Sequence, residues 1–582
     1  MRLIFSGKQS AGLLLLTLFL LLLSCSQEKH RLPGSVASFK GPSEQAIKSW
    51  SGQKFSMFIH FGVYSLLGGV YENQPVTYGY SEQIRAHGKI SRENYRKIAA
   101  RFNPVKWNPD SVVALARQAG MKSIVITSKH HDGFAMFNTA ETDFDIVDFT
   151  PYKRDILKEL SEACAKENIK FGVYFSLIDW DFPGAVPISA HNSDSIPPAH
   201  HQMNMNQVKE LMTGYGPISE IWFDMGKPTF EQSHELANLV HKYQPDCLIS
   251  GRIWNDQGDF AVMGDNASPD FLMGTLWQAP ASMFDETWGY RSWQIRENSS
   301  EKTDQKIRAL SRVVTNGGNY LLNIGPMGDG EIVPFEKTVL SGIGNWISFN
   351  SESIYNTTVP DNFPAQTWGN ISYGKKLYLH ILNNPINNEI NLRGLTSNIT
   401  SAYFLERPEE KLKFKKSGEG WVISYDLTKR TGFSVPVIAV ELSNQLSYKP
   451  DHLIKASEAE EFQLSTSNAD RYHSYSGKDY YTTKPTLVKM GWNLYAEAKK
   501  NKTIQLNFKK ADTDKLIRIM FDESGIDIPL NLAEQQNSTD NYQIEIKDIE
   551  LRQGINRVSL FLTDQSNPHR DIGLESLVIR IY

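Results

Sequence analysis

Side chains that suit the recognition and cleavage of a sugar recur in the first half of the chain. Aromatic rings offer flat apolar faces to a pyranose ring, and His, Arg and carboxylate side chains offer directional hydrogen bonds to its hydroxyl groups. Cleavage of a glycosidic bond needs two carboxyl groups, one that attacks the sugar or activates water and one that protonates the leaving oxygen. The candidates of these types are His60, His130, His131, Tyr174, Trp222, Asp224 and Arg252.

Asp224 is the best candidate for the attacking carboxylate. It ends the apolar run that begins at Ile221, which would place its side chain at the mouth of the fold, facing a substrate. Arg252 closes the next apolar run and could keep that carboxylate ionised by lowering its pKa. The alternative interpretation is that the two residues form a salt bridge that is purely structural.

The elements that must position these residues alternate between apolar strand-like runs and helix-like stretches, from about Lys40 to Asn350. That alternation predicts a parallel sheet with crossover helices, closed into a (β/α)8-like TIM barrel whose active site lies at the carboxyl ends of its strands. The expected strands are Ser56–Phe61, Lys122–Ser128, Lys170–Ser176, Glu220–Asp224, Cys247–Arg252, Phe271–Trp277 and Tyr320–Gly325, with an eighth assumed around Ala261–Asp265.

The sequence changes character after Asn350, where short β-type segments alternate with Asn, Gly and Pro turns. This pattern predicts a catalytic barrel over 36–355, a β-sandwich over 356–445 and a second β-sandwich over 446–582. The polar stretch Gln445–Asp470 is expected to be a linker. The last domain could bind carbohydrate or serve a structural role.

The N-terminus has the features of an export signal. Arg2 and Lys8 precede the uncharged stretch Ala11–Leu23, which is shorter than a membrane-spanning helix. The following Ser24-Cys25 completes a run that resembles a bacterial lipobox. We therefore expect residues 1–25 to be a lipoprotein signal peptide, with Cys25 lipidated and the protein exported and anchored to a membrane, in the periplasm or at the cell surface. An ordinary signal peptide is the alternative.

Bulk properties exclude several other classes of protein. A chain of 582 residues is too long for one hydrophobic core, and its 22% charged residues with a net charge of -4 give no reason to expect nucleic acid as a partner. Cys164 and Cys247 lie in apolar surroundings and predict no disulfide framework. Because no CxxC or HExxH spacing occurs, no metal site is expected. The oligomeric state stays open.

Over roughly Lys40–Tyr355 the chain resembles the α-L-fucosidases of glycoside hydrolase family 29. The motifs that carry the resemblance are Phe58-Ile59-His60-Phe61-Gly62, Lys129-His130-His131-Asp132-Gly133-Phe134, Asp155 after Lys153-Arg154, Gly172-Val173-Tyr174-Phe175-Ser176, Ile221-Trp222-Phe223-Asp224-Met225-Gly226, Trp288-Gly289-Tyr290 and the run from Gly317 to Pro326. The two β-rich segments after Tyr355 add nothing to it.

The resemblance implies roles for individual residues. Asp224 matches the nucleophile, which forms a glycosyl-enzyme ester that water hydrolyses with net retention. The residues that match a fucose pocket are His60, Glu72, His130, His131, Tyr174, Trp222, Arg252 and Trp288. The implied substrate is a terminal α-L-fucoside of an oligosaccharide or glycoconjugate, and no cofactor is required.

The acid/base residue is where the chain departs from the family pattern. Many relatives carry a Trp-Glu pair before the Trp-Gly-Tyr motif, but the second residue of that pair is Gln278 here. We therefore expect Glu286 to serve as the acid/base, with Asp285 second and Glu72, in a loop where relatives also place a glutamate, third. In a retaining enzyme its carboxyl group should lie about 5–5.5 Å from that of Asp224.

Two alternative functions follow from the same residues. An α-L-galactosidase would act on a sugar that differs from L-fucose by one hydroxyl group, which a hydrophobic pocket rejects only weakly. A catalytically impaired glycan-binding protein would explain Gln278, since a glutamine cannot donate a proton usefully.

Overall fold

A computed structural model describes residues 41–582, except 184, 186–194, 269–272, 274, 384, 386–387, 419, 426–431, 475–485, 510–513, 522–523, 536–540, 563–573 and 575. The predicted signal peptide and Cys25 lie outside the described residues. None of the described helices is both long and apolar enough to cross a membrane.

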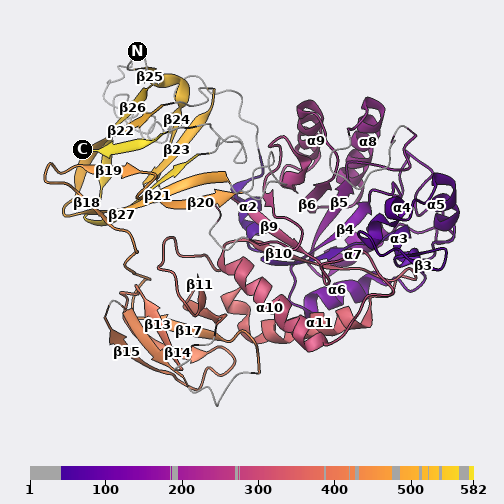
Figure 1. Cartoon of the computed structure of the whole chain (residues 1–582), viewed down its shortest axis with the longest axis horizontal. Helices are drawn as coiled ribbons and strands as arrows, with labels where there is room; N and C mark the ends of the chain where they lie inside the picture. The colour runs from indigo at the N-terminus through magenta and orange to yellow at the C-terminus, as the bar shows by residue number, and fades with distance from the viewer. Residues whose placement is uncertain are drawn as a thin grey trace, which may run out of the picture. The chain divides into compact units, whose positions relative to one another are not determined.

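An eight-stranded parallel sheet forms the first part of the described chain (Figure 1). Around the sheet, neighbouring strands follow one another in the order of the sequence. The sheet is closed by one parallel bridge between Ser250, which follows edge strand β7, and Phe260, which precedes edge strand β8. This arrangement confirms the predicted TIM-barrel class. The strands are β1 (Phe55–Ile59), β4 (Ser123–Lys129), β5 (Lys170–Ser176), β6 (Ile218–Asp224), β7 (Leu248–Ile249), β8 (Ala261–Val262), β9 (Trp277–Ala281) and β10 (Asn319–Ile324).

The strands are almost entirely buried because helices cover the outer face of the sheet and side chains fill its interior. The interior cluster takes one or two large apolar side chains from most strands, among them Phe58, Val125, Trp222 and Leu321. This packing fixes the strands on which the polar side chains of the mouth are mounted.

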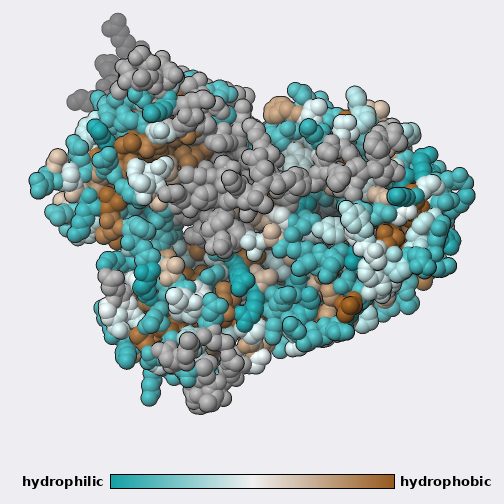
Figure 2. All heavy atoms as spheres, in the orientation of Figure 1, coloured by the Kyte–Doolittle hydropathy of each residue, from teal (hydrophilic) through white to brown (hydrophobic). Residues whose placement is uncertain are grey.

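Capping residues start several of the covering helices. Asp155 accepts a hydrogen bond from the backbone of Lys158 at the start of α7, and Thr229 forms a capping box with Gln232 at the start of α9. The main helices are α2 (Glu44–Ser51), α5 (Arg92–Ala99), α6 (Pro109–Gln118), α7 (Ile156–Lys166), α8 (Pro198–Gly214), α9 (Phe230–Tyr243), α10 (Ser299–Thr315) and α11 (Pro334–Asn350). On the face shown in Figure 2 the described surface over the helices is mostly hydrophilic, as expected when each helix turns its apolar side inward.

Two of the seven predicted strands have bounds that differ from the observed ones by more than two residues. The prediction of a strand at Phe271–Trp277 was wrong, because β9 begins only at Trp277 and continues to Ala281. Residues 271, 272 and 274 lie outside the described residues, and the polar Gln278 and the Pro280 make β9 hard to recognise as a buried strand. The predicted strand Cys247–Arg252 is shortened to β7, since a 3-10 turn follows at Gly251–Ile253.

Mainly antiparallel sheets form the rest of the described chain, with one short parallel pair between β18 and β21 (Thr486–Ala496). A four-stranded sheet and a three-stranded sheet enclose one apolar core, over Gly369–Leu442. The strands of the first are β11 (Gly369–Tyr373), β12 (Leu377–Ile381), β17 (Val437–Leu442) and β14 (Ile399–Phe404), and those of the second are β13 (Glu389–Arg393), β16 (Gly420–Ser424) and β15 (Lys413–Ser417). A six-stranded and a five-stranded sheet built from β18 to β28 enclose another. The predicted linker Gln445–Asp470 contains β18 (Ile454–Lys455) and β19 (Phe462–Ser465), and Phe462 is buried in the second core, so this stretch is not merely a linker.

Candidate active site

Asp224 is the last residue of β6, at the carboxyl edge of the parallel sheet, and its side chain is buried. The hydroxyl group of Tyr174, on the neighbouring strand β5, donates to its Oδ2 at 2.8 Å, and Arg252 donates to its Oδ1 at 2.9 Å. Burial alone would raise the pKa of Asp224, but the charge of Arg252, the nearby His131 and the hydrogen bonds from Arg252 and Tyr174 together outweigh it and hold the pKa below its usual value. The carboxylate is therefore ionised and fixed in orientation.

The chain turns sharply directly after this carboxylate. Met225 has a φ of 64°, in the left-handed region that side chains with a Cβ seldom occupy. Strain of this kind persists where the surrounding structure holds it, and such positions cluster at functional sites. The backbone of Asp224 is held by a hydrogen bond from the amide of Leu177 to its carbonyl group.

Arg252 connects the nucleophile candidate to a second carboxylate. Its other terminal nitrogen donates to Oδ1 of Asp265 at 2.7 Å, and its guanidinium group lies 4.8 Å from the ring centre of Trp222. Asp265 was not among the predicted site residues. It ended the segment assumed to be the eighth strand, so the rule that active-site residues follow strand ends could have found it.

The three predicted histidines lie together beside Asp224. His60 follows β1 and pairs through Nδ1 with Oδ1 of Asn323 at 2.7 Å, and His131 pairs through Nδ1 with Oγ of Ser176 at 2.8 Å. The ring of His130 lies between them, 5.5 Å from that of His60 and 3.8 Å from that of His131.

Burial keeps these histidines neutral. It lowers the pKa of His60 to about 3 and that of His131 to about 4, and it also lowers the pKa of His130 well below the usual value. A neutral imidazole has one donor and one acceptor nitrogen, which suits a sugar hydroxyl group that can also donate and accept.

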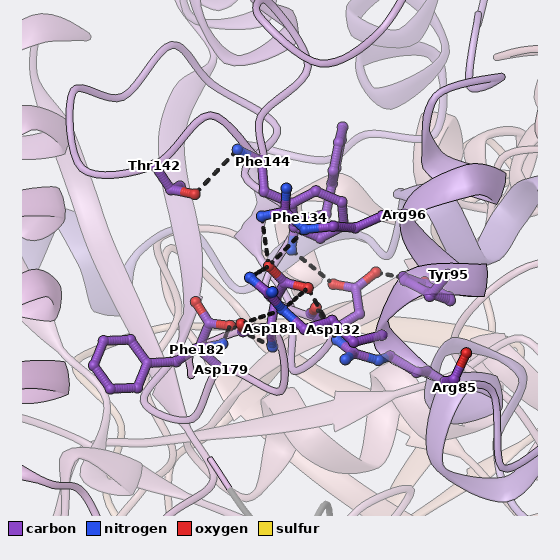
Figure 3. Close-up of polar contacts among 12 residues, drawn as sticks. Arg85, Tyr95, Arg96, Asp132, Phe134, Thr142, Phe144, Asp179, Asp181 and Phe182 are labelled. Carbon is purple, nitrogen blue, oxygen red and sulfur yellow. Dashed lines mark hydrogen bonds and ion pairs between the residues drawn. The ribbon is translucent and has the colours of Figure 1, made fainter. Parts of the chain in front are cut away.

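A buried charged network supports the turn that carries His130 and His131 (Figure 3). Asp132 accepts hydrogen bonds from the Tyr95 hydroxyl group at 2.6 Å and from the Phe134 amide, and Arg85 donates to its carbonyl oxygen. Asp181 next to it is bound by Arg96 at 2.7 Å, and Arg92 also binds it. Because the carboxyl groups of Asp132 and Asp181 each accept hydrogen bonds from two residues, this network can hold the turn in place.

Trp288 lies in the loop after β9, and its ring centre is 5.4 Å from that of His60. Glu82, a buried residue of the 3-10 turn Ser81–Gln83, holds this loop by accepting hydrogen bonds from the amides of Trp288 at 3.2 Å and Gly289 at 2.8 Å. Burial raises the pKa of Glu82 to about 7. Gly325 at the end of β10 approaches the same loop so closely that a Cβ there would lie 2.7 Å from the backbone nitrogen of Tyr290. Glu82 had no signal in the sequence.

Gln278 does not lie at the mouth of the barrel. It is the second residue of β9, fully buried, and it bonds to the side chains of Trp222 and Glu220. The sequence places it where many relatives carry a glutamate, but here its side chain points into the core beneath the site.

The three carboxylates considered for the acid/base role lie in exposed segments. Asp285 and Glu286 are exposed on the loop that also carries Trp288, and the backbone carbonyl oxygen of Glu286 accepts a hydrogen bond from Arg291. Glu72 is exposed in the turn between β2 (Val70–Tyr71) and β3 (Gln74–Pro75). Glu286 thus lies on the loop whose Trp288 side chain contacts the site. Glu72 is related to the site only by its place in the loop region after β1.

The assembled site pairs an ionised, oriented carboxylate with neutral hydrogen-bonding rings and apolar aromatic faces. Within the described part of the chain, no group of three or more His, Cys, Asp or Glu residues is arranged to hold a metal ion. The arrangement can bind a polar ring with an apolar face and attack it with Asp224.

The known proteins that this chain resembles are α-L-fucosidases. The family model described as α-L-fucosidase matches residues 24–352. Tissue α-L-fucosidase of Homo sapiens is 28% identical over 423 residues, covering 68% of this chain and 89% of the human one. That of Mus musculus is 29% identical over 329 residues, covering 53% of this chain and 71% of the mouse one.

Solved structures resemble a larger part of the chain. An α-L-fucosidase from Vibrio sp. strain EJY3 superposes with a TM-score of 0.63 at 26% identity, covering 93% of this chain and 98% of that one. α-L-Fucosidase isoenzyme 1 from Paenibacillus thiaminolyticus has a TM-score of 0.60 at 28% identity, covering 69% of this chain and 99% of that one.

Proposed function

This chain belongs to the α-L-fucosidase family of glycoside hydrolases, and from that premise we propose that it removes terminal α-L-fucose from glycans with retention of configuration. The observation that carries the proposal is the carboxylate of Asp224. It is buried at the carboxyl end of β6, bonded by Tyr174 and Arg252, and held in the ionised form.

The reaction proceeds in two displacements. Asp224 attacks the anomeric carbon, so that a bond from its carboxylate oxygen to this carbon forms while the bond to the leaving oxygen breaks, and the acid/base residue protonates that oxygen. The same residue then removes a proton from water, which attacks the anomeric carbon and releases fucose and the free carboxylate. His60, His130 and His131 hold the hydroxyl groups of the sugar, and Trp288 supplies an apolar face.

Glu286 is our proposed acid/base residue. Its support is its place on the loop that carries Trp288 into the site, and Asp285 and Glu72 remain the second and third candidates. Substitution by alanine in each of the three, and in Asp265 as a fourth test position, should be assayed with and without azide. We expect azide to restore turnover in Glu286→Ala alone, because a small anion can replace an attacking water that lacks its base. Rescue at another position instead would move the role there.

Turnover of synthetic substrates tests the activity itself. We expect the protein to hydrolyse aryl α-L-fucoside and to prefer it to aryl α-L-galactoside, and we expect Asp224→Ala to abolish hydrolysis. A preference for the galactoside would change the substrate assignment. Binding of fucosylated glycans without turnover, equally strong in Asp224→Ala, would support a glycan-binding protein. The position of Gln278 in the core removes the observation that motivated that alternative.

We also propose that the protein is exported and anchored to a membrane through lipidated Cys25. The support is the pattern of residues 1–25 alone. Expression of the full chain and of Cys25→Ala, followed by fractionation, tests it. The full chain should sediment with membranes and the variant should be released. Equal release of both would indicate an ordinary cleaved signal.

A further inference from the structure

A chain of buried hydrogen bonds lies beneath the floor of the site. The indole nitrogen of Trp50, from α2, donates to Oε2 of Glu220 at 2.8 Å. The amide nitrogen of Gln278, from β9, donates to the same oxygen at 3.1 Å. The indole nitrogen of Trp222, from β6, then donates to Oε1 of Gln278 at 2.8 Å. Glu220 and Gln278 have no exposed surface, so no water replaces these bonds.

The two indole groups at the ends of this chain of hydrogen bonds determine which side-chain types can lie between them. An indole N–H group can only donate, so Trp50 and Trp222 each require an acceptor. Gln278 is an acceptor toward Trp222 and a donor toward Glu220, and a neutral amide can be both at once without binding a proton. A carboxylate at 278 would face the carboxylate of Glu220 in the core, and an apolar side chain would leave Trp222 without a partner.

Trp222 connects this chain of bonds to the reacting groups. Its ring packs against that of Tyr174, with centres 5.9 Å apart and planes 23° apart, and the guanidinium group of Arg252 lies 4.8 Å from its centre. Tyr174 and Arg252 are the two side chains that bond to the carboxylate of Asp224. A shift of the indole ring would therefore move both groups that orient the nucleophile.

We propose that Gln278 and Glu220 are positioning residues that fix Trp222 and, through it, the orientation of Asp224. This inference rests on the proposed function of the site and gives Gln278 a role other than that of a lost acid. The interior leaves little room for adjustment, because a Cβ at Gly172 of β5 would lie 3.0 Å from Cγ of Glu220.

An exchange of the two side chains is the sharpest test. In the double variant Glu220→Gln with Gln278→Glu, Trp50 donates to the amide oxygen at 220, the amide nitrogen at 220 donates to the carboxylate at 278, and Trp222 donates to that carboxylate. Each of the three hydrogen bonds is restored, and only the bond between residues 220 and 278 runs in the opposite direction. In Glu220→Gln alone, two amide N–H groups or an amide and an indole N–H group face each other. In Gln278→Met both bonds of Gln278 are lost.

The measurement is steady-state hydrolysis of aryl α-L-fucoside, with kcat and KM determined separately. We expect Glu220→Gln and Gln278→Met to lower kcat/KM about 10- to 100-fold, mostly through kcat, because an unpaired buried donor displaces Trp222. The double variant should return to within about threefold of the natural protein. Ser311→Ala is the control, since it loses a buried hydrogen bond between α10 and His380 that involves none of these residues, and it should lower the melting temperature without changing kcat/KM.

Gln278→Glu alone gives a second readout that a merely structural role would not move. Its two carboxyl groups must share one proton to stay bonded, so we expect its kcat/KM relative to the natural protein to fall as pH rises. The groups that face this pair are the indoles of Trp50 and Trp222 and, near Glu220, the thiol of Cys247, whose pKa is raised by burial and by the charges of Asp259 and Glu220. Cys247 stays protonated over the range of the assay.

The outcomes separate the inference from the proposed function. Unchanged kcat/KM in the single variants, or a double variant no better than Glu220→Gln, overturns the inference even if the natural protein hydrolyses the fucoside. Binding of a fucose-configured iminocyclitol, measured by calorimetry, is followed in parallel. If the natural protein turns over no fucoside but binding weakens in the singles and returns in the double, the proposed function fails and the inference stands.

Discussion

Arg252 controls the charge of the nucleophile candidate more than any other side chain. Its guanidinium group lies 2.9 Å from the carboxylate of Asp224 in a buried setting, and it opposes the rise in pKa that burial causes. We predict that Arg252→Met raises the pKa of Asp224, because burial then acts without the opposing positive charge. The acidic limb of the pH profile of kcat/KM should move up by the same amount, because the nucleophile must be ionised in the free enzyme.

A matched substitution distinguishes this effect from a general loss of charge. Arg393 forms an exposed ion pair with Asp451 in the antiparallel part of the chain. Arg393→Met should leave the profile unchanged, since exposed pairs contribute little. An acidic limb that stays in place in Arg252→Met, despite a folded protein, would show that other groups hold Asp224 ionised.

The sequence predicted individual site residues where one rule applied. Polar groups at the ends of apolar strands identified Asp224, His60 and Tyr174, which the structure brings together around one carboxylate. The rule failed for Gln278, because the boundaries of its strand were misplaced and the inward side of β9 cannot be read without them. It also could not find Glu82, whose partners are backbone amides more than two hundred residues later in the chain.

Two residues of the turn at Ser81–Gln83 attach the loop after β9, namely Glu82 and Ser81, whose hydroxyl group pairs with that of Thr287 at 2.9 Å. Glu82 accepts from the amides of Trp288 and Gly289, and Trp288 contacts the ring of His60. We predict that Glu82→Leu releases the loop, lowers kcat/KM about 10- to 100-fold with a rise in KM, and speeds hydrogen exchange of the amides in 284–290. Two buried backbone donors then lack a partner, each at a cost of about 1–3 kcal/mol.

The conservative variant Glu82→Gln separates the loss of the acceptor from the loss of charge. Its amide oxygen can still accept from the loop, so its effect on exchange should be smaller than that of Glu82→Leu. If the two variants behaved alike, the charge of Glu82 rather than its hydrogen bonds would matter for the loop.

At the level of elements, most of the fold could be predicted from the pattern of apolar residues in the sequence. Long apolar runs such as Lys170–Ser176 were predicted with their observed bounds, because a buried parallel strand needs a continuous apolar segment. β7 and β8 have only two residues each and are held by neighbours rather than by their own sequence. β19 was hidden in a polar stretch, since only the alternation of Phe462 and Leu464 marks its buried face.

Two kinds of buried ionisable group in the molecule have opposite effects on how its stability depends on pH. Burial raises the pKa of Glu82 and Glu220 to about 7 and that of Glu336 to about 8. It lowers the pKa of buried histidines, including His60 to about 3 and His380 to about 4. Each group makes the free energy of unfolding depend on pH only between its unfolded and folded pKa values. The histidines therefore contribute to the pH dependence below about pH 6.5, and the glutamates contribute between about pH 4.3 and pH 8.

Above about pH 6.5 the histidines therefore no longer change the stability with pH, and the effect of the glutamates remains. Their folded pKa values exceed the unfolded ones, so the native state holds more protons there, and its stability falls as pH rises. We predict that the free energy of unfolding drops on the order of 2–3 kcal/mol between about pH 6.5 and pH 8, with the largest share from Glu336. Thermal unfolding of the natural protein and of Glu336→Gln at the two pH values tests this. The variant keeps an acceptor for the amide of Gly325, 3.3 Å from Oε2 of Glu336, but cannot titrate, so its melting temperature should fall less. An equal fall in both proteins would mean that Glu336 is not the group that loses its proton.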